Sequence, residues 1–149
     1  EQEDATSIAV RALGLKAGQV VADIGAGSGY YTVRMADVVG PTGKVYATDI
    51  QPGMLDILRR RVSSAGLKNV ETVLGAPDDP NLQADTLDLA LMVDVYHALS
   101  APLPDSWPES TPRRIRRGTR NSDQRTKLAR SCHADAIMFI WCKAPESGR

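Results

Sequence analysis

Three aspartates that lie at the ends of apolar segments are the residues of this chain best suited to chemistry. Asp23, Asp49 and Asp94 each close a short run rich in Val, Ile, Leu, Met and Ala. If these runs are parallel strands of one sheet, the carboxylates lie at the edge where open α/β folds bind ligands. Clustered carboxylates favour a ligand that carries positive charge. The pattern therefore predicts a site for a cationic nucleoside.

A glycine-rich loop follows the first of these aspartates. Residues 23–29 read Asp-Ile-Gly-Ala-Gly-Ser-Gly, and glycines there allow positive φ angles and let a ligand approach the backbone. The third glycine of the dinucleotide fingerprint G-x-G-x-x-G would fall on Tyr30, so the fingerprint is incomplete. A carboxylate beside the loop would also repel a pyrophosphate. A nucleotide- or dinucleotide-binding module is therefore the alternative interpretation.

Asp49 lies 20 residues after Gly29, at the position where a carboxylate accepts hydrogen bonds from the 2′- and 3′-hydroxyls of a ribose. The same charge disfavours a 2′-phosphate. For each strand-end aspartate, and for Asp78, the competing interpretation is that its side chain only caps the next helix.

The elements that must position these residues alternate in type, which is typical of a parallel α/β sheet. Apolar runs predict strands over 19–23, 44–50, 70–74 and 87–93. Helical spacing predicts a short helix near Ile8, one over 30–39 and one from Pro52 to Gly66. We expect a three-layer, Rossmann-like sheet with the strand order 3-2-1-4, to which 134–143 could add a fifth strand.

Four motifs in this order resemble those of the class I S-adenosylmethionine-dependent methyltransferases. They read VVADIGAGSG over 20–29, VYATDI over 45–50, NVETVLGA over 69–76 and LDLALMVDVYHAL over 87–99. The resemblance covers residues 8–100. It implies S-adenosylmethionine as the cofactor and methyl transfer to an acceptor that the sequence does not identify.

The resemblance also implies a role for individual residues. Asp23 would hold the amino group of the methionine moiety, and Asp49 would take the ribose hydroxyls. Ile50 would pack on the adenine face, while Ala76 and Asp78 would meet the adenine edge. The complete set of expected cofactor-binding residues is Asp23, Gly25, Ala26, Gly27, Gly29, Asp49, Ile50, Ala76, Asp78 and Asp94.

No residue is assigned to catalysis or to a metal. Methyl transfer from a sulfonium is an in-line displacement that depends mainly on positioning, so it needs no nucleophile motif. We interpret His97 as a structural residue. Cys132, His133 and Cys142 lack the spacing of a zinc site, so we expect no metal.

The formal net charge of zero hides two unlike parts. Residues 1–100 carry 8 Lys and Arg against 13 Asp and Glu, whereas residues 101–149 carry 10 against 5. We predict a cofactor-binding domain over 1–100 and a basic divergent tail over 101–149, disordered or out of frame. A basic-tailed RNA-binding protein is the second alternative. Because 113–130 lacks interleaved aromatic residues, we do not expect a nucleic-acid partner.

The division of the chain also bears on activity. A sheet that ends at 87–93 would leave an apolar edge strand, so we expect impaired methyl-transfer activity from this chain.

The longest apolar run, Ala136 to Cys142, is far shorter than the ~20 residues of a membrane helix, and the acidic start lacks the features of a signal peptide. We predict a cytoplasmic protein with no membrane partner, while a targeting segment before Glu1 stays an open alternative.

Overall fold

The computed structural model describes residues 5–77, 79–82, 86–93 and 138–142 of the 149-residue chain. The helices are α1 (Ala5–Ala12), α2 (Tyr30–Val39) and α3 (Pro52–Ser64). The strands are β1 (Val20–Ile24), β2 (Lys44–Asp49), β3 (Val70–Leu74), β4 (Leu89–Val93) and β5 (Met138–Cys142). Each predicted helix and strand is present, with ends displaced by a few residues.

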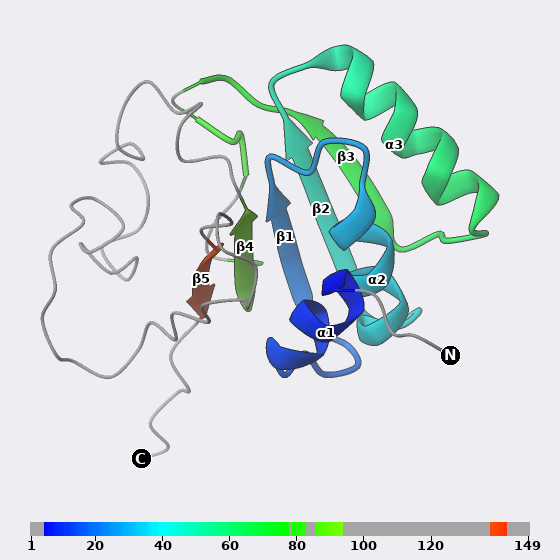
Figure 1. Cartoon of the computed structure of the whole chain (residues 1–149), viewed down its shortest axis with the longest axis vertical. Coiled ribbons are helices and arrows are strands. Elements are labelled where there is room, and N and C mark those ends of the chain that lie inside the picture. The colour runs from blue at the N-terminus through cyan, green and yellow to red at the C-terminus, as the bar shows by residue number, and fades with distance from the viewer. Residues whose placement is uncertain (1–4, 78, 83–85, 94–137, 143–149) are drawn as a thin grey trace, which may run out of the picture.

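The strands form one sheet in the order β3-β2-β1-β4-β5 (Figure 1). The first four are parallel, and Val21 of β1 lies beside Val45 of β2 and Leu89 of β4. The predicted order 3-2-1-4 is therefore confirmed. All four parallel strands end at the same edge of the sheet, which is where the described members of the expected site lie.

The expectation that 87–93 forms a bare sheet edge is wrong. β5 pairs antiparallel with β4 along its whole length, from Leu89 opposite Cys142 to Val93 opposite Met138. The free backbone groups of β4 on that side are thus hydrogen-bonded within the sheet, which protects an edge strand from pairing with other chains. The rest of the predicted tail, 101–137 and 143–149, lies outside the described residues, as does His97.

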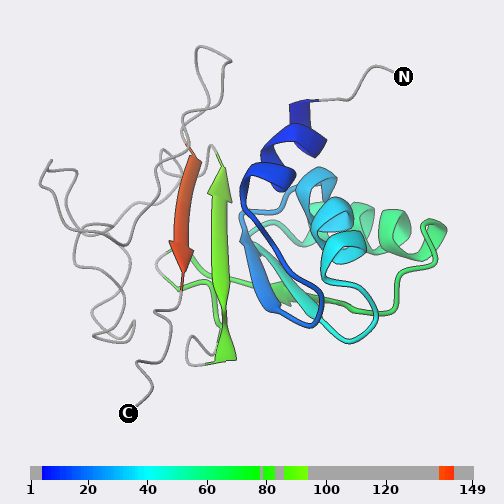
Figure 2. The same ribbon diagram turned by 90° about the horizontal axis from the view of Figure 1, so that it is seen from below.

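All three described helices cover the same face of the sheet (Figure 2). Alternate strand residues point to that face, because successive side chains of a strand point to opposite sides. Val21, Val45 and Leu91 are buried there against α1 and α2. On the opposite face, within the described residues, Leu82 and Leu87 from the β3–β4 connection pack against β1 and β4. The described residues therefore form two of the three expected layers, one layer of helices and the sheet.

Proline and glycine mark the limits of the helices next to the site. α2 begins after Gly29 and is followed by Gly40, both with positive φ. α3 begins with Pro52, whose missing N–H costs nothing in the first helical turn, and ends before Gly66, which again has positive φ. The longest described helix, α3, has 13 residues, and none of the described helices has the length and apolar character to cross a membrane.

Candidate functional site

The glycine loop, residues 25–29, connects β1 to α2 at the carboxyl edge of the sheet. The N–H groups of Gly25 and Ala26 both donate to the carbonyl of Thr48, at 2.8 and 2.9 Å, which ties the loop to β2. Gly25, Gly27 and Gly29 have φ angles of 72°, 56° and 87°. These are left-handed conformations that side chains disfavour, so the backbone path itself requires the three glycines.

The second and third glycines of the loop have different surroundings. A Cβ atom built on Gly27 would meet no atom within 4 Å. A Cβ atom on Gly29 would lie 2.9 Å from Cγ of Leu58, a buried residue of α3. Gly29 thus allows α3 to pack closely against the loop, whereas Gly27 faces open space where a ligand can reach the backbone.

Asp49, the last residue of β2, holds the glycine loop and the start of α3 through its carboxylate. Its Oδ2 accepts a hydrogen bond from the Gly27 N–H at 2.9 Å, and its Oδ1 accepts one from the Gln51 N–H at 2.8 Å. Neither donor belongs to the first turn of α3, whose N-cap residue Gln51 makes no side-chain cap hydrogen bond, so these bonds hold the loop and the residue before the helix. Because a carboxylate has about four acceptor positions, each oxygen can still accept a hydrogen bond from a ligand hydroxyl.

Asp23 is a buried carboxylate at the base of the loop, with only 3% of its surface exposed. It accepts hydrogen bonds from the hydroxyl of Thr32, at 2.6 Å, and from the Thr32 backbone N–H. Burial raises the pKa of Asp23 to about 6, against the lowering effect of Thr32 and with a small further increase from Asp49. No described Lys or Arg forms an ion pair with Asp23. A buried anion without a cation suits a ligand ammonium group.

We expect the stability of the ligand-free protein to depend on pH through Asp23. Its folded-state pKa of about 6 lies above the ordinary value of 3.8, so its contribution is fully present below about pH 4 and is lost as the pH rises through 6. A pKa difference of about two units corresponds to about 3 kcal/mol of unfolding free energy. Urea unfolding of the wild type and of Asp23→Asn between pH 4 and 8 measures this contribution.

The wild type should lose on the order of 3 kcal/mol of unfolding free energy relative to Asp23→Asn across that range. Asp37→Asn, at an exposed position on α2, is the matched control and should track the wild type. If the difference in unfolding free energy between the wild type and Asp23→Asn does not change with pH, the raised pKa of Asp23 is wrong.

Of the other residues expected to bind the cofactor, Ile50 and Ala76 lie in the described part of the chain. The N–H of Gly75 donates to the carbonyl of Asp49 at 3.0 Å, which brings the exposed Ala76 to the end of β2. Ile50 follows Asp49 directly and is 42% exposed. Asp78 and Asp94 lie outside the described residues. The structure thus brings together both described aspartates, the glycine loop, Ile50 and the start of the β3–β4 connection.

Sequence reasoning missed Thr32, which has no exposed surface and contacts Asp23 directly. The signal for it was available. Thr32 lies three, four and seven residues before Met35, Ala36 and Val39, the buried residues of α2. A hydroxyl on an otherwise apolar helix face needs a buried partner, and Asp23 on the preceding strand was the nearest candidate.

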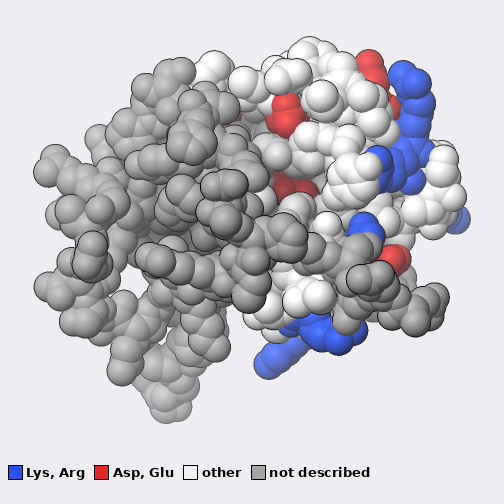
Figure 3. All heavy atoms as spheres, in the orientation of Figure 1, with Lys and Arg blue, Asp and Glu red and all other residues white. Residues whose placement is uncertain are grey.

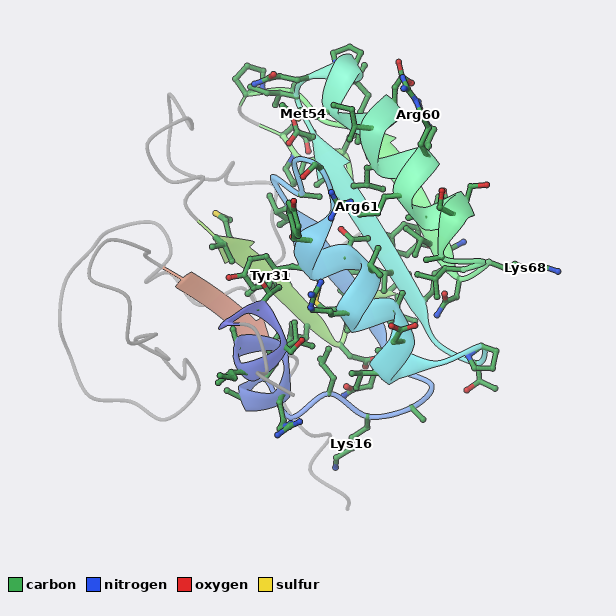
Figure 4. All side chains as sticks on the ribbon, turned by 45° about the vertical axis from the view of Figure 1, so that its right-hand side comes forward. Lys16, Tyr31, Met54, Arg60, Arg61 and Lys68 are labelled. Carbon is green, nitrogen blue, oxygen red and sulfur yellow. The ribbon has the colours of Figure 1, made fainter. Side chains whose placement is uncertain are left out.

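Charged side chains of both signs lie on the described surface. In Figure 3, acidic side chains lie in the middle and at the border of the described surface, and Lys and Arg side chains lie on its right-hand and lower parts. In Figure 4, Met54 lies at the start of α3 near the carboxyl edge, whereas Lys16 and Lys68 lie toward the opposite end of the strands. Arg60 lies at the same end as Met54 (Figure 4), so the suitability for a cationic ligand rests on Asp23 and Asp49 themselves and not on the wider surface charge. The described residues contain no group of acidic, His or Cys side chains that could hold a metal ion.

Comparison with known proteins places this geometry in context. A family described as a methyltransferase domain matches residues 21–118. The protein-L-isoaspartate O-methyltransferase of Methanothrix thermoacetophila is 38% identical over 63 residues, which are 42% of this chain and 30% of that protein. A probable cobalt-precorrin-6B C(15)-methyltransferase of Sulfolobus acidocaldarius is 38% identical over 71 residues, 47% of this chain and 37% of that protein.

A solved structure agrees with these sequence matches. The crystal structure of a SAM dependent methyltransferase from Aquifex aeolicus superposes with a TM-score of 0.61 at 36% identity, covering 65% of this chain and 52% of that one. The chain spans about a third of the length of the curated relatives it matches.

Proposed function

The chain belongs to the family of class I S-adenosylmethionine-dependent methyltransferase domains, and we propose from this premise that it binds S-adenosylmethionine at the carboxyl ends of β1 and β2 for methyl transfer. The observation that carries the proposal is the open backbone at Gly27, in a loop that starts after the carboxylate of Asp23 and is held by the carboxylate of Asp49. One carboxylate is buried without a cation and the other is partly exposed.

Three parts of the cofactor, its ammonium group, its ribose and its adenine face, have a described residue of suitable chemistry. The ammonium group suits Asp23, whose buried charge lacks a described cationic partner. The ribose hydroxyls suit Asp49, whose two oxygens keep acceptor positions beside the loop. The exposed Ile50 offers an apolar surface to the adenine face. A pyrophosphate would meet these same carboxylates and be repelled, so the dinucleotide alternative is disfavoured.

When bound, S-adenosylmethionine supplies a methyl group activated by its sulfonium. The chain's own residues act by binding and orientation. Asp23 and Asp49 hold two separate groups of one ligand, and the glycine loop lets that ligand lie against the backbone. Fixing the reacting methyl group in line with an acceptor removes much of the entropic barrier to displacement.

The acceptor stays open. The relatives named above carry names with different acceptors, a protein isoaspartate and a cobalt-precorrin, so the shared fold does not select one. Impaired turnover by this chain also stays a prediction, although one of its premises, a bare β4 edge, does not hold. A cytoplasmic location and the absence of a nucleic-acid partner are likewise predictions.

Replacing Asp49 by Ala tests the ribose contact. The variant loses a carboxylate that would accept two hydroxyl hydrogen bonds, which should cost about 1.5–3 kcal/mol of affinity for S-adenosylhomocysteine, or roughly tenfold or more in Kd. Isothermal titration calorimetry measures the change, and circular dichroism checks that the variant is folded.

Asp56→Ala is the matched control, because Asp56 is an exposed carboxylate on α3 that pairs with Arg59. The affinity of Asp56→Ala for S-adenosylhomocysteine should equal that of the wild type. A parallel titration with NAD should show no binding. Unchanged affinity in a folded Asp49→Ala protein would remove Asp49 from the site, and tight NAD binding would favour the dinucleotide alternative.

A further inference from the structure

The contact between Thr32 and Asp23 joins the first turn of α2 to β1 beneath the glycine loop. Both side chains are buried, and the hydroxyl of Thr32 lies 2.6 Å from Oδ2 of Asp23. A hydroxyl that donates to a carboxylate forms a short, charge-assisted hydrogen bond. The orientation of the Asp23 carboxylate is therefore fixed from the helix side, across the loop.

The two carboxylates of the site hold the loop at different points. Asp49 accepts the N–H of Gly27 in the middle of the loop, and Asp23 accepts the hydroxyl and N–H of Thr32 just after it. These two bonds to Thr32 occupy about half of the acceptor positions of the Asp23 carboxylate. The remainder can accept hydrogen bonds from a ligand.

The charged groups on the described elements around Asp23 either oppose its charge or contact other residues; on α3, Arg61 lies over the ring of Tyr30, 3.9 Å from its centroid. Asp49 on β2 raises the pKa of Asp23. The described residues of β4 are all apolar. On α2, Arg34 donates to Ser7 and to the carbonyl of Tyr30, while Lys44 at the far end of β2 pairs with Glu71. Thr32 is thus the described residue whose hydrogen bonds favour the ionised form of Asp23.

We propose that Thr32 is a positioning residue for cofactor binding, whose hydroxyl orients the Asp23 carboxylate and favours its ionised form for contact with a ligand ammonium group. The proposal rests on the proposed function, because it takes the ammonium of S-adenosylmethionine or S-adenosylhomocysteine as the ligand group. It predicts that cofactor affinity rises with pH as Asp23 ionises, and that Thr32 sets where this rise occurs.

Thr32→Val tests the proposal, because valine has nearly the shape of threonine but cannot donate a hydrogen bond. The pKa of Asp23 in the ligand-free variant, followed by carboxyl ¹³C NMR, should rise by about one unit because the donor to the charged form is lost. The affinity for S-adenosylhomocysteine should then fall about fivefold near pH 6. The loss should shrink to less than about twofold at pH 8.5, where Asp23 is ionised in both proteins.

Three further variants complete the experiment. Thr32→Ser keeps the hydroxyl and should restore the wild-type pH profile, and Thr32→Ala replaces Thr32→Val if the latter does not fold. Thr72→Val is the matched control, because the hydroxyl of Thr72 on β3 contacts Arg59 and lies outside the site. This control should leave both the pKa of Asp23 and the affinity unchanged.

The outcomes separate this proposal from the proposed function. An affinity loss in Thr32→Val that is equal at every pH, with the pKa of Asp23 unmoved, would overturn the positioning role and leave Thr32 as a packing residue. If the wild type does not bind S-adenosylhomocysteine at any pH, the proposed function fails and the role in cofactor binding fails with it. The NMR titration then still reports the coupling between hydroxyl and carboxylate.

Discussion

Replacing Gly27 by Val should lower the affinity for S-adenosylhomocysteine at least ~100-fold, which is about 2.7 kcal/mol or more. Two effects add. Gly27 has a φ of 56°, a left-handed conformation that costs a non-glycine residue roughly 1–2 kcal/mol. The space beside its Cα is open, so the new side chain would enter the volume that we assign to the ligand. Isothermal titration calorimetry measures the loss of affinity.

Gly14→Val separates the two effects. Gly14 has a φ of 64° and equally open surroundings, but it follows α1 and is distant in sequence from the glycine loop. This control should lower the free energy of unfolding by an amount similar to that of Gly27→Val and leave the affinity within twofold of the wild type. Equal affinity losses in both variants would show that a general loss of stability, and not a blocked ligand site, explains the result.

The second large effect is on stability. Leu58→Ala should lower the free energy of unfolding by about 2–5 kcal/mol, because truncating a buried leucine loses its transfer free energy and leaves a cavity. Leu58 has no exposed surface and is the side chain on which the backbone of Gly29 rests. Urea-induced unfolding followed by circular dichroism measures the change.

Ile57→Ala is the matched control, because Ile57 precedes Leu58 on the same helix but is 43% exposed. Its loss of stability should stay below about 1 kcal/mol, because less apolar area leaves water on folding. If both variants lose the same amount, α3 does not pack on the glycine loop as the structure has it. The cavity next to Gly29 should also loosen the loop, so Leu58→Ala is expected to weaken cofactor binding where Ile57→Ala does not.

The strands and the glycine loop could be predicted from the sequence because each has a strong local signal. Runs of Val, Ile, Leu and Ala closed by Asp or Gly predicted β1 to β4, and the spacing of the motifs predicted their order. For the segment 134–143 the apolar run left a buried strand and a short helix as alternatives, and the structure has the strand β5 over 138–142. Its antiparallel pairing with β4 was not predicted, because pairing between distant segments has no signature in local periodicity.

The internal contacts of the site were less accessible to sequence reasoning. The sequence indicates a ligand role or a helix-capping role for Asp49, whereas its two oxygens accept the backbone N–H groups of Gly27 and Gln51. The glycines of the loop were expected to serve the ligand together, whereas Gly29 also serves the packing of Leu58. Such distinctions depend on which helix lies over which turn, and this follows from tertiary packing and not from motif spacing. The cofactor roles of all these residues stay predictions.

Cofactor binding at the carboxyl edge is tested most directly by a titration of the ¹⁵N-labelled full chain with S-adenosylhomocysteine. We predict saturable shifts in the amide signals of the glycine loop, residues 25–29, and of Asp49 and Gln51. Lys16 and Lys68, which lie toward the opposite end of the strands (Figure 4), should keep their signals unchanged. Absence of saturable shifts, or shifts confined to residues outside the carboxyl edge, would contradict the account.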